Sequence, residues 1–473
     1  IHTSVYISED TEALRWLGGR LCDMLASAIP EQKPKLLEAS QAAPKDAIVL
    51  RMMPSSLGDE GYTLDVTEQG IQIQAPTPAG LLYGVQTLGQ LLQPTVSPHG
   101  IPCVRIKDQP RFQWRGLMLD CSRTFQSLDY LRKTIDRMAM YKMNVLHLHL
   151  TDDQGWRLEI KRYPELTRKG ARFPEKYKQP DAYHGFYTQE DMRALVKYGQ
   201  QRNVTIVPEI ELPGHSLAIL SCYPELPCTG GPFEIYPFFE GDHITRDIAC
   251  AGNEKTFEFF ENVFSEVVAV FPSAFIHIGG DEAPKDRWEA CSKCQARIKE
   301  EGLKNTHELQ SYFVKRIEDI LTKHNRRLIG WDEILEGGLA PNASVMNWRG
   351  VENGKAAASM GHDVVMSPTT HCYFDYTYER ISSEHAYSFN PIPEGLSDAQ
   401  KKHIIGIQAN FWSHIDRTPA RTDAQLFPRL LAIAERAWSP KEQTSWPDFY
   451  RRQQQQIPIL QVSGVVSYDE TKP

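Results

Sequence analysis

The segment Phe275-Ile276-His277-Ile278-Gly279-Gly280-Asp281-Glu282-Ala283 places two adjacent acids directly after a short apolar stretch. The apolar stretch predicts a buried strand, and a helix-like segment follows near Ala283-Pro284. Neighbouring side chains on a continuing strand point to opposite faces, so Asp281 and Glu282 converge only if the two glycines bend the backbone. When two carboxylates converge, their repulsion raises the pKa of one of them, which favours one protonated acid beside one anion. The alternative is that Asp281 caps the next helix.

The same order of strand, loop and helix recurs from Phe112 onwards. Strands are predicted near residues 116–120, 144–150, 204–210, 275–279, 327–331, 344–348, 363–366 and 404–409. Helical periodicity covers residues 128–141, 189–201, 254–270, 306–323, 350–360 and 424–438. Eight strands that alternate with helices predict an α/β fold of the (β/α)₈ TIM barrel type. A doubly wound sheet is the alternative, but no glycine-rich phosphate loop follows the first strand.

The first 107 residues have a different pattern and predict a small non-catalytic α+β domain. Residues 60–66 and 70–75 alternate in polarity and predict a hairpin, with helices over residues 12–28 and 81–92. Residues 94–102 are expected to form an exit loop. We therefore divide the chain into an α+β domain (1–107), a catalytic barrel (108–445) and a C-terminal helix or tail (446–473).

Composition limits the classes of partner. The 473 residues are 41% hydrophobic and 24% charged, with a formal net charge of -8, which is typical of a globular protein and argues against a nucleic-acid or anionic-membrane partner. The sequence contains no run of about 18 apolar residues, so no membrane span is predicted. The chain starts at Ile1, and we expect that a leader precedes it and directs export to a periplasm or the extracellular space.

The nine cysteines leave the redox compartment open. Cys291-Ser292-Lys293-Cys294 has the spacing of half a zinc site, but the sequence shows no second pair with ligand spacing. A local disulfide or two free thiols is therefore favoured over a metal. Cys222 and Cys228 are a candidate pair across a loop.

Residue types suited to a sugar gather where the strands are expected to end, which is where a TIM barrel places its active site. Acids alternate with aromatic residues, whose faces stack on sugar C–H surfaces while carboxylates bind hydroxyls. These strand-end segments are 147–156, 209–215, Asp281-Glu282, 331–333, Trp348, 371–376 and 411–412.

Two other classes of function compete with a sugar hydrolase. In a metal-dependent hydrolase, His147 and His149 would bind the metal with His215 and one of the nearby aspartates. Paired histidines on a buried strand are more often structural, and the tryptophans would then have no role. The other alternative is a carbohydrate-binding protein with an inactive barrel, against which the intact Asp281-Glu282 pair argues.

Four segments, 114–120, 147–156, 208–215 and 277–283, resemble in order the motifs of the family 20 glycoside hydrolases, the β-N-acetylhexosaminidases. The resemblance extends from about residue 112 to 438, and the preceding module resembles the family's non-catalytic domain. It implies exo-acting, retaining release of terminal β-linked N-acetylglucosamine or N-acetylgalactosamine from a glycan or glycoconjugate. It implies no metal and no cofactor, and it is compatible with a homodimer.

The resemblance also implies a mechanism in which the substrate's own 2-acetamido oxygen attacks the anomeric carbon. Glu282 is expected to act as general acid and then as general base. Asp281 is expected to stay ionised, to accept the acetamido N–H and to keep Glu282 protonated. Tyr373 is expected to donate to the acetamido oxygen.

Further roles carry over by the same resemblance. Arg115 is expected to bind the outer hydroxyls of the sugar, and Asp375 a hydroxyl near O4 or O6. His215 is expected to form a relay behind Glu282 with either Asp152 or Asp153, between which the sequence does not choose. The pocket walls are expected to be Trp331, Trp348 and Trp412.

The segment Trp412-Ser413-His414 departs from the family's Trp-x-Glu pattern. His414 replaces a carboxylate that usually binds a distal hydroxyl, so the preference at O4 and O6 is in doubt. One hypothesis is that loss of the anion admits a 6-sulfated sugar. The favoured alternative is a simple variant that takes ordinary substrates.

Overall fold

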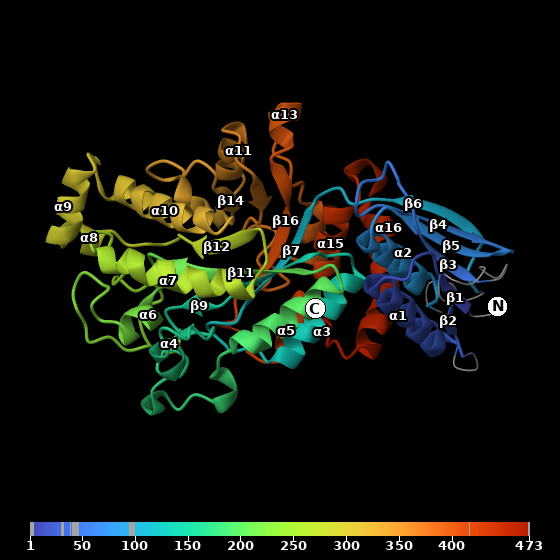
Figure 1. Ribbon diagram of the computed structural model, residues 1–473, viewed down its shortest axis with the longest axis horizontal. Coiled ribbons are helices and arrows are strands. Elements are labelled where there is room, and N and C mark those ends of the chain that lie inside the picture. Colours follow the sequence, from blue (N-terminus) through green and yellow to red (C-terminus); the bar gives the residue numbers. More distant parts are fainter. Residues whose placement is uncertain are drawn as a thin grey trace.

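The computed structural model describes residues 4–29, 33–37, 39, 47–93, 100–415 and 417–471. The described chain forms an N-terminal module of sheet and helices beside a larger barrel (Figure 1). Residues 94–99 of the expected exit loop lie outside the described residues. Among the described helices, none combines the length and apolar character that a bilayer crossing requires.

The N-terminal module is built on a six-stranded sheet with the strand order β2-β1-β3-β5-β4-β6. The predicted hairpin is present, because β4 and β5 pair antiparallel. Thr11 and Thr77 cap the two helices, α1 (Glu12–Ala28) and α2 (Pro78–Leu91), whose apolar faces pack on the sheet. The strands are β1 (Ser4–Ile7), β2 (Lys35–Leu37), β3 (Ile48–Met52), β4 (Tyr62–Thr67), β5 (Gly70–Ala75) and β6 (Val104–Asp108).

The predicted TIM barrel is confirmed. Eight parallel strands form a closed ring in which the last strand, β16, pairs with the first, β7. The strands are β7 (Trp114–Asp120), β8 (Val145–His149), β11 (Thr205–Leu212), β12 (Phe275–Gly279), β13 (Arg327–Trp331), β14 (Ser344–Asn347), β15 (Val364–Met366) and β16 (Ile404–Phe411).

Helices cover the outside of the barrel between successive strands (Figure 1). The main ones are α3 (Leu128–Met140), α5 (Gln189–Gln200), α7 (Glu254–Val270), α10 (Thr306–Lys323), α11 (Glu352–Ser359) and α15 (Leu430–Trp438). The helix predicted over 424–438 is in fact two, α14 (Pro419–Leu426) and α15. Phe427 is extended before Pro428, because proline disfavours the helical conformation of its predecessor and has no N–H to donate.

Shorter elements lie in the connections between the main strands and helices of the barrel. They are β9 (Thr151–Asp152), β10 (Gly155–Trp156), α4 (Glu165–Arg168), α6 (Leu217–Cys222), α8 (Asp286–Ala290), α9 (Ser292–Glu300), α12 (Ser383–Ser388) and α13 (Asp398–Lys401), with short 3₁₀ turns at 175–177, 181–183, 332–335 and 441–443. The C-terminal helix α16 (Trp446–Val462) follows the barrel.

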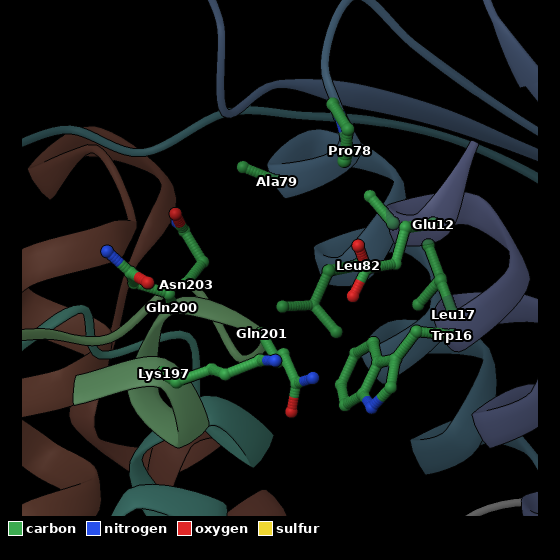
Figure 2. Close-up of a pocket in the computed structure, with 11 residues that line it drawn as sticks. Glu12, Trp16, Leu17, Pro78, Ala79, Leu82, Lys197, Gln200, Gln201 and Asn203 are labelled. Atoms are coloured by element: carbon green, nitrogen blue, oxygen red, sulfur yellow. The ribbon is translucent and has the colours of Figure 1, made fainter. Parts of the chain in front are cut away.

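The two modules meet at the N-terminal face of the barrel. A cavity of about 440 Å³ lies in this seam, where Trp16 and Leu82 face Lys197 and Gln201 across the gap (Figure 2). Asn203, at the same cavity, lies just before β11 begins. The active site of a TIM barrel lies at the C-terminal ends of its strands. This cavity lies at the N-terminal ends, where residues serve the stability of the fold.

Candidate active site

Asp281 and Glu282 converge directly after β12, as the two glycines predicted. Gly279 and Gly280 have positive φ angles of 66° and 92°, and Glu282 itself has a φ of 42°. Oxygens of the two carboxylates and a ring nitrogen of His215 all lie within 4.8 Å of one another. Asp281 does not cap a helix, since the next one, α8, begins after Lys285 without a side-chain cap.

Gly279 admits no side chain. An added Cβ would lie 1.6 Å from Oε2 of Glu211, on the neighbouring strand β11. The bend that aims the two acids therefore depends on glycine for its backbone conformation and for the space it leaves.

His215 connects the acids to the carboxylates behind them. Its Nε2 lies 3.5 Å from Glu282 Oε2 and 3.6 Å from Asp281 Oδ2, and its Nδ1 lies 3.3 Å from Asp152 Oδ1. Asp153 is farther from Nδ1, at 3.7 Å, and its Oδ1 accepts the backbone N–H of Leu217. The geometry therefore favours Asp152 as the partner of His215, with Asp153 fixing the backbone around it.

In the free protein the pKa of Asp281 lies above that of Glu282, whereas the sequence-based expectation was a protonated Glu282 beside an ionised Asp281. Burial raises the pKa of Asp281 to about 6. A hydrogen bond with His215 lowers the pKa of Glu282, which is more exposed than its neighbour. Burial opposes a charge on His215, but the Asp152 carboxylate raises the pKa of that imidazole well above its ordinary value. These shifts favour an ionised Glu282 beside a protonated His215 when the site is empty.

Aromatic side chains surround these groups in two layers. Tyr373 lies with its ring centroid 6.2 Å from that of Trp348 and 6.3 Å from that of Trp412. Trp331 lies one layer deeper, 5.8 Å from Trp412, and its Nε1 donates to Glu209 inside the barrel. The rings thus form a wall and a floor at the strand ends.

The surroundings of two further acids raise their pKa values to near neutral pH. Burial raises the pKa of Asp375 to about 7. Burial and then the charge of Asp281 raise the pKa of Glu333 to about 8, and its Oε2 accepts the Nε1 proton of Trp348. Glu333 was visible as a strand-end acid in the sequence but received no role there. It lines a cavity of about 490 Å³ with Glu282 and Trp348.

Arg115 does not lie in the site, so this prediction is wrong. It is the second residue of β7, at the N-terminal end of the barrel, and it is completely buried. Its guanidinium forms two hydrogen bonds, of 2.9 and 2.8 Å, to Glu60 of the N-terminal module and a third to the Tyr83 hydroxyl. Its role is to join the two modules.

Arg123 is the guanidinium at the correct end of β7. Its NH2 group lies 2.8 Å from Asp152 Oδ2, and the group stacks 4.9 Å from the ring centroid of Trp412. It lies three residues after the last strand residue, Asp120. Counting outward from the predicted end of the strand would have selected it over Arg115.

Matched substitutions separate the two arginines. Arg123→Lys keeps the charge but loses the planar fork, and we expect kcat/KM to fall about 10- to 100-fold with little change in stability. Arg115→Lys should leave kcat/KM of the folded protein unchanged and lower the free energy of unfolding by about 1–3 kcal/mol. Steady-state kinetics and urea denaturation of both variants measure these effects. A loss of kcat/KM confined to Arg115→Lys would contradict the assignment.

His414 lies against Phe238 with ring centroids 4.5 Å apart. Burial lowers the pKa of this histidine to about 4, so it is neutral near pH 7. The position therefore supplies neither the family's usual anion nor a cation.

Comparison with known proteins places this site in a family. The description "Glycosyl hydrolase family 20, catalytic domain" matches residues 112–441, and "Glycosyl hydrolase family 20, domain 2" matches residues 3–109. The chain belongs to glycosyl hydrolase family 20. The family that the sequence motifs indicated is thus confirmed.

Relatives of this family 20 chain share its sequence over most of its length. It is 45% identical over 428 residues to a beta-hexosaminidase of Porphyromonas gingivalis. The match covers 86% of this chain but only 54% of that protein. It therefore spans about half the length of this relative. A beta-hexosaminidase of Akkermansia muciniphila is 33% identical, with 90% of this chain and 88% of that protein covered.

A solved family 20 structure has the same fold. The exo beta-N-acetylglucosaminidase of Vibrio harveyi, crystallised in complex with N-acetylglucosamine, superposes with a TM-score of 0.87 at 31% identity. The match covers 99% of this chain and 75% of that one.

The family 20 assignment does not favour a metal-dependent hydrolase. The carboxylates around His149 raise its pKa to about 10 against the effect of burial, and both ring nitrogens then donate, Nδ1 to Glu209 and Nε2 to Asp152, each at 2.7 Å. His147 contacts Gln408 and Glu209 and is completely buried. The paired histidines are thus structural groups of the barrel interior.

Proposed function

We propose that this protein is an exo-acting, retaining β-N-acetylhexosaminidase that uses the acetamido group of its substrate as the nucleophile. The observation that carries the proposal is the pair Asp281-Glu282, which converges beside Tyr373 and a wall of tryptophan rings at the strand ends. The substrate is a glycan or glycoconjugate with a terminal β-linked N-acetylglucosamine or N-acetylgalactosamine. Such substrates favour a site of action outside the cytoplasm.

Each reacting group has a defined proton or charge to handle. The acetamido oxygen attacks C1 while Glu282 gives its proton to the leaving oxygen, and an oxazolinium ring results. Asp281 accepts the acetamido N–H and stabilises the positive charge. Glu282 then removes a proton from water as that water opens the ring at C1. Tyr373 orients the acetamido oxygen for the attack.

Substrate binding would restore the protonation order that this chemistry needs. A sugar over Glu282 excludes water and raises the pKa of that carboxyl, while the acetamido N–H favours the charged form of Asp281. His215, 3.5 Å from Glu282, is placed to pass its proton to that carboxylate. The histidine thus acts as a local proton store, and Asp152 holds it in position.

A pair of matched substrates tests the proposal. The protein should hydrolyse p-nitrophenyl N-acetyl-β-glucosaminide and retain the anomeric configuration in the first-formed product, as followed by proton NMR. It should leave p-nitrophenyl β-glucoside, which lacks the acetamide, essentially untouched. Comparable turnover of the two glycosides, or an inverted product, would contradict the mechanism.

The 6-sulfated N-acetylglucosaminide extends the same panel. Because His414 is neutral and supplies no cation, we expect the sulfated glycoside to be hydrolysed no faster than the plain one. A higher kcat/KM for the sulfated glycoside would instead support the hypothesis that loss of the family's carboxylate admits an anionic sugar.

A further inference from the structure

Four cysteines from separate parts of the sequence meet beside the active-site loops. Cys228 lies in the loop after α6, Cys250 lies just before α7, and Cys291 and Cys294 lie at the start of α9. Their sulfur atoms all lie within 4.8 Å of one another. The segment between α6 and α7 thus supplies the second pair that the sequence alone did not reveal. Cys228 does not pair with Cys222, which contacts the Glu165 carbonyl instead.

The spacing of the sulfurs fits a tetrahedral metal centre. The Sγ atoms are 3.6 Å apart for Cys250 and Cys294, 3.7 Å for Cys228 and Cys294, and 3.8 Å for Cys250 and Cys291. A zinc–sulfur bond of about 2.3 Å gives a tetrahedron whose edges are about 3.8 Å. Disulfide sulfurs lie about 2.05 Å apart. The distance between Cys250 and Cys294 is as short as the other two distances. The four sulfurs therefore form one cluster and not two separate pairs.

The local backbone is arranged around these sulfurs. Cys291 is the N-cap residue of α9, so the positive end of the helix dipole favours thiolates at this position. Gly230, with a φ of 79°, turns the chain two residues after Cys228. Gly252 packs so closely on α9 that an added Cβ would lie 2.2 Å from the carbonyl carbon of Lys293. Cys250 and Cys294 are completely buried.

We propose that Cys228, Cys250, Cys291 and Cys294 form a structural zinc site. Zinc binding displaces the thiol protons to solvent and leaves four thiolates around one ion. Because the four cysteines fill a tetrahedral shell, no coordination position stays open for water or substrate. The site is thus separate from the hydrolytic chemistry and does not depend on the proposed function.

The zinc would join the two loops that flank the catalytic acids. One loop follows β11, and the other carries α8 and α9 after Asp281-Glu282. The same two loops are also joined by Trp288, whose Nε1 donates to the Ala249 carbonyl, and by an ion pair of 2.9 Å between Arg287 and Asp247. The metal would therefore hold the rim of the pocket in place and would take no part in the reaction.

Metal analysis of the full chain, purified without chelators, tests the site. We expect about one zinc ion per chain by mass spectrometry of the metal, released when a mercurial reagent blocks the thiols. The double variant Cys250→Ser, Cys294→Ser should retain less than about a tenth of this zinc. Cys222→Ser is the matched control, since Cys222 lies near the same loop outside the cluster, and it should keep its zinc.

The wild-type protein alone decides the outcome if the double variant does not fold. Wild-type chain without stoichiometric metal, with an intact mass about 4 Da below that of the reduced chain, would show two disulfides and overturn the proposal. Iron at the same stoichiometry would overturn the assignment to zinc. Zinc that persists in a folded double variant would place the ion elsewhere and overturn the site.

Discussion

Glu282→Gln is expected to slow the hydrolysis of substrates with poor leaving groups by about 10²–10⁴-fold, because glutamine cannot protonate the departing oxygen. Substrates with good leaving groups need less protonation, and formation of the intermediate from them should be affected much less. Steady-state and burst kinetics with p-nitrophenyl and alkyl N-acetyl-β-glucosaminides measure this difference.

Azide separates the two roles of Glu282. An anion that attacks C1 needs no general base, so azide should accelerate turnover of the p-nitrophenyl substrate by the Glu282→Gln variant and yield a glycosyl azide. Glu336→Gln is the control, because Glu336 lines the same cavity but pairs with Arg349. An equal loss for good and poor leaving groups, without azide rescue, would remove Glu282 from the acid–base role.

Asp281→Asn is expected to lower kcat by about 10²–10³-fold with a smaller effect on KM, because the charge that Asp281 stabilises develops mainly in the transition state. The pH profile adds a second measurement. Since the pKa of Asp281 is raised to about 6 and its charged form is the active one, kcat/KM of the parent should fall as the pH drops below 6.

The acid limb near pH 6 should disappear in Asp281→Asn, whose amide does not titrate. An unchanged kcat, or an acid limb that persists at the same pH in the variant, would contradict the assigned role of Asp281. The second outcome would point to another buried acid, such as Asp375.

The barrel was predictable because its evidence is periodic and local. The alternation of strands and helices survives in the sequence even where bounds differ by one or two residues, and α7 and α10 coincide with the predicted ranges. The division of 424–438 into two helices was less visible, because the prediction followed apolar spacing and passed over the conformational restriction that Pro428 imposes.

Site residues were predictable where a motif fixed them to a strand end, and less so where a contact across the fold decided them. Asp281, Glu282 and His215 come together as expected. Arg115 lies inside the motif segment 114–120 and Arg123 lies three residues after it, so what separates them is the end of β7 that each is near. The proton on His215 and the four-sulfur cluster depend on distances between remote segments, which spacing along the chain does not encode.

The guanidinium at the base of β7 makes the barrel dependent on its neighbour. A fragment trimmed to the barrel would retain the acids and aromatic rings at the strand ends. It would, however, leave the buried guanidinium of Arg115 without Glu60 and Tyr83, its partners in the N-terminal module. Chimeras that exchange the leading module between homologues must for the same reason transfer both sides of this contact together. The pairing of this one guanidinium therefore makes the N-terminal module a requirement for the stability of the barrel.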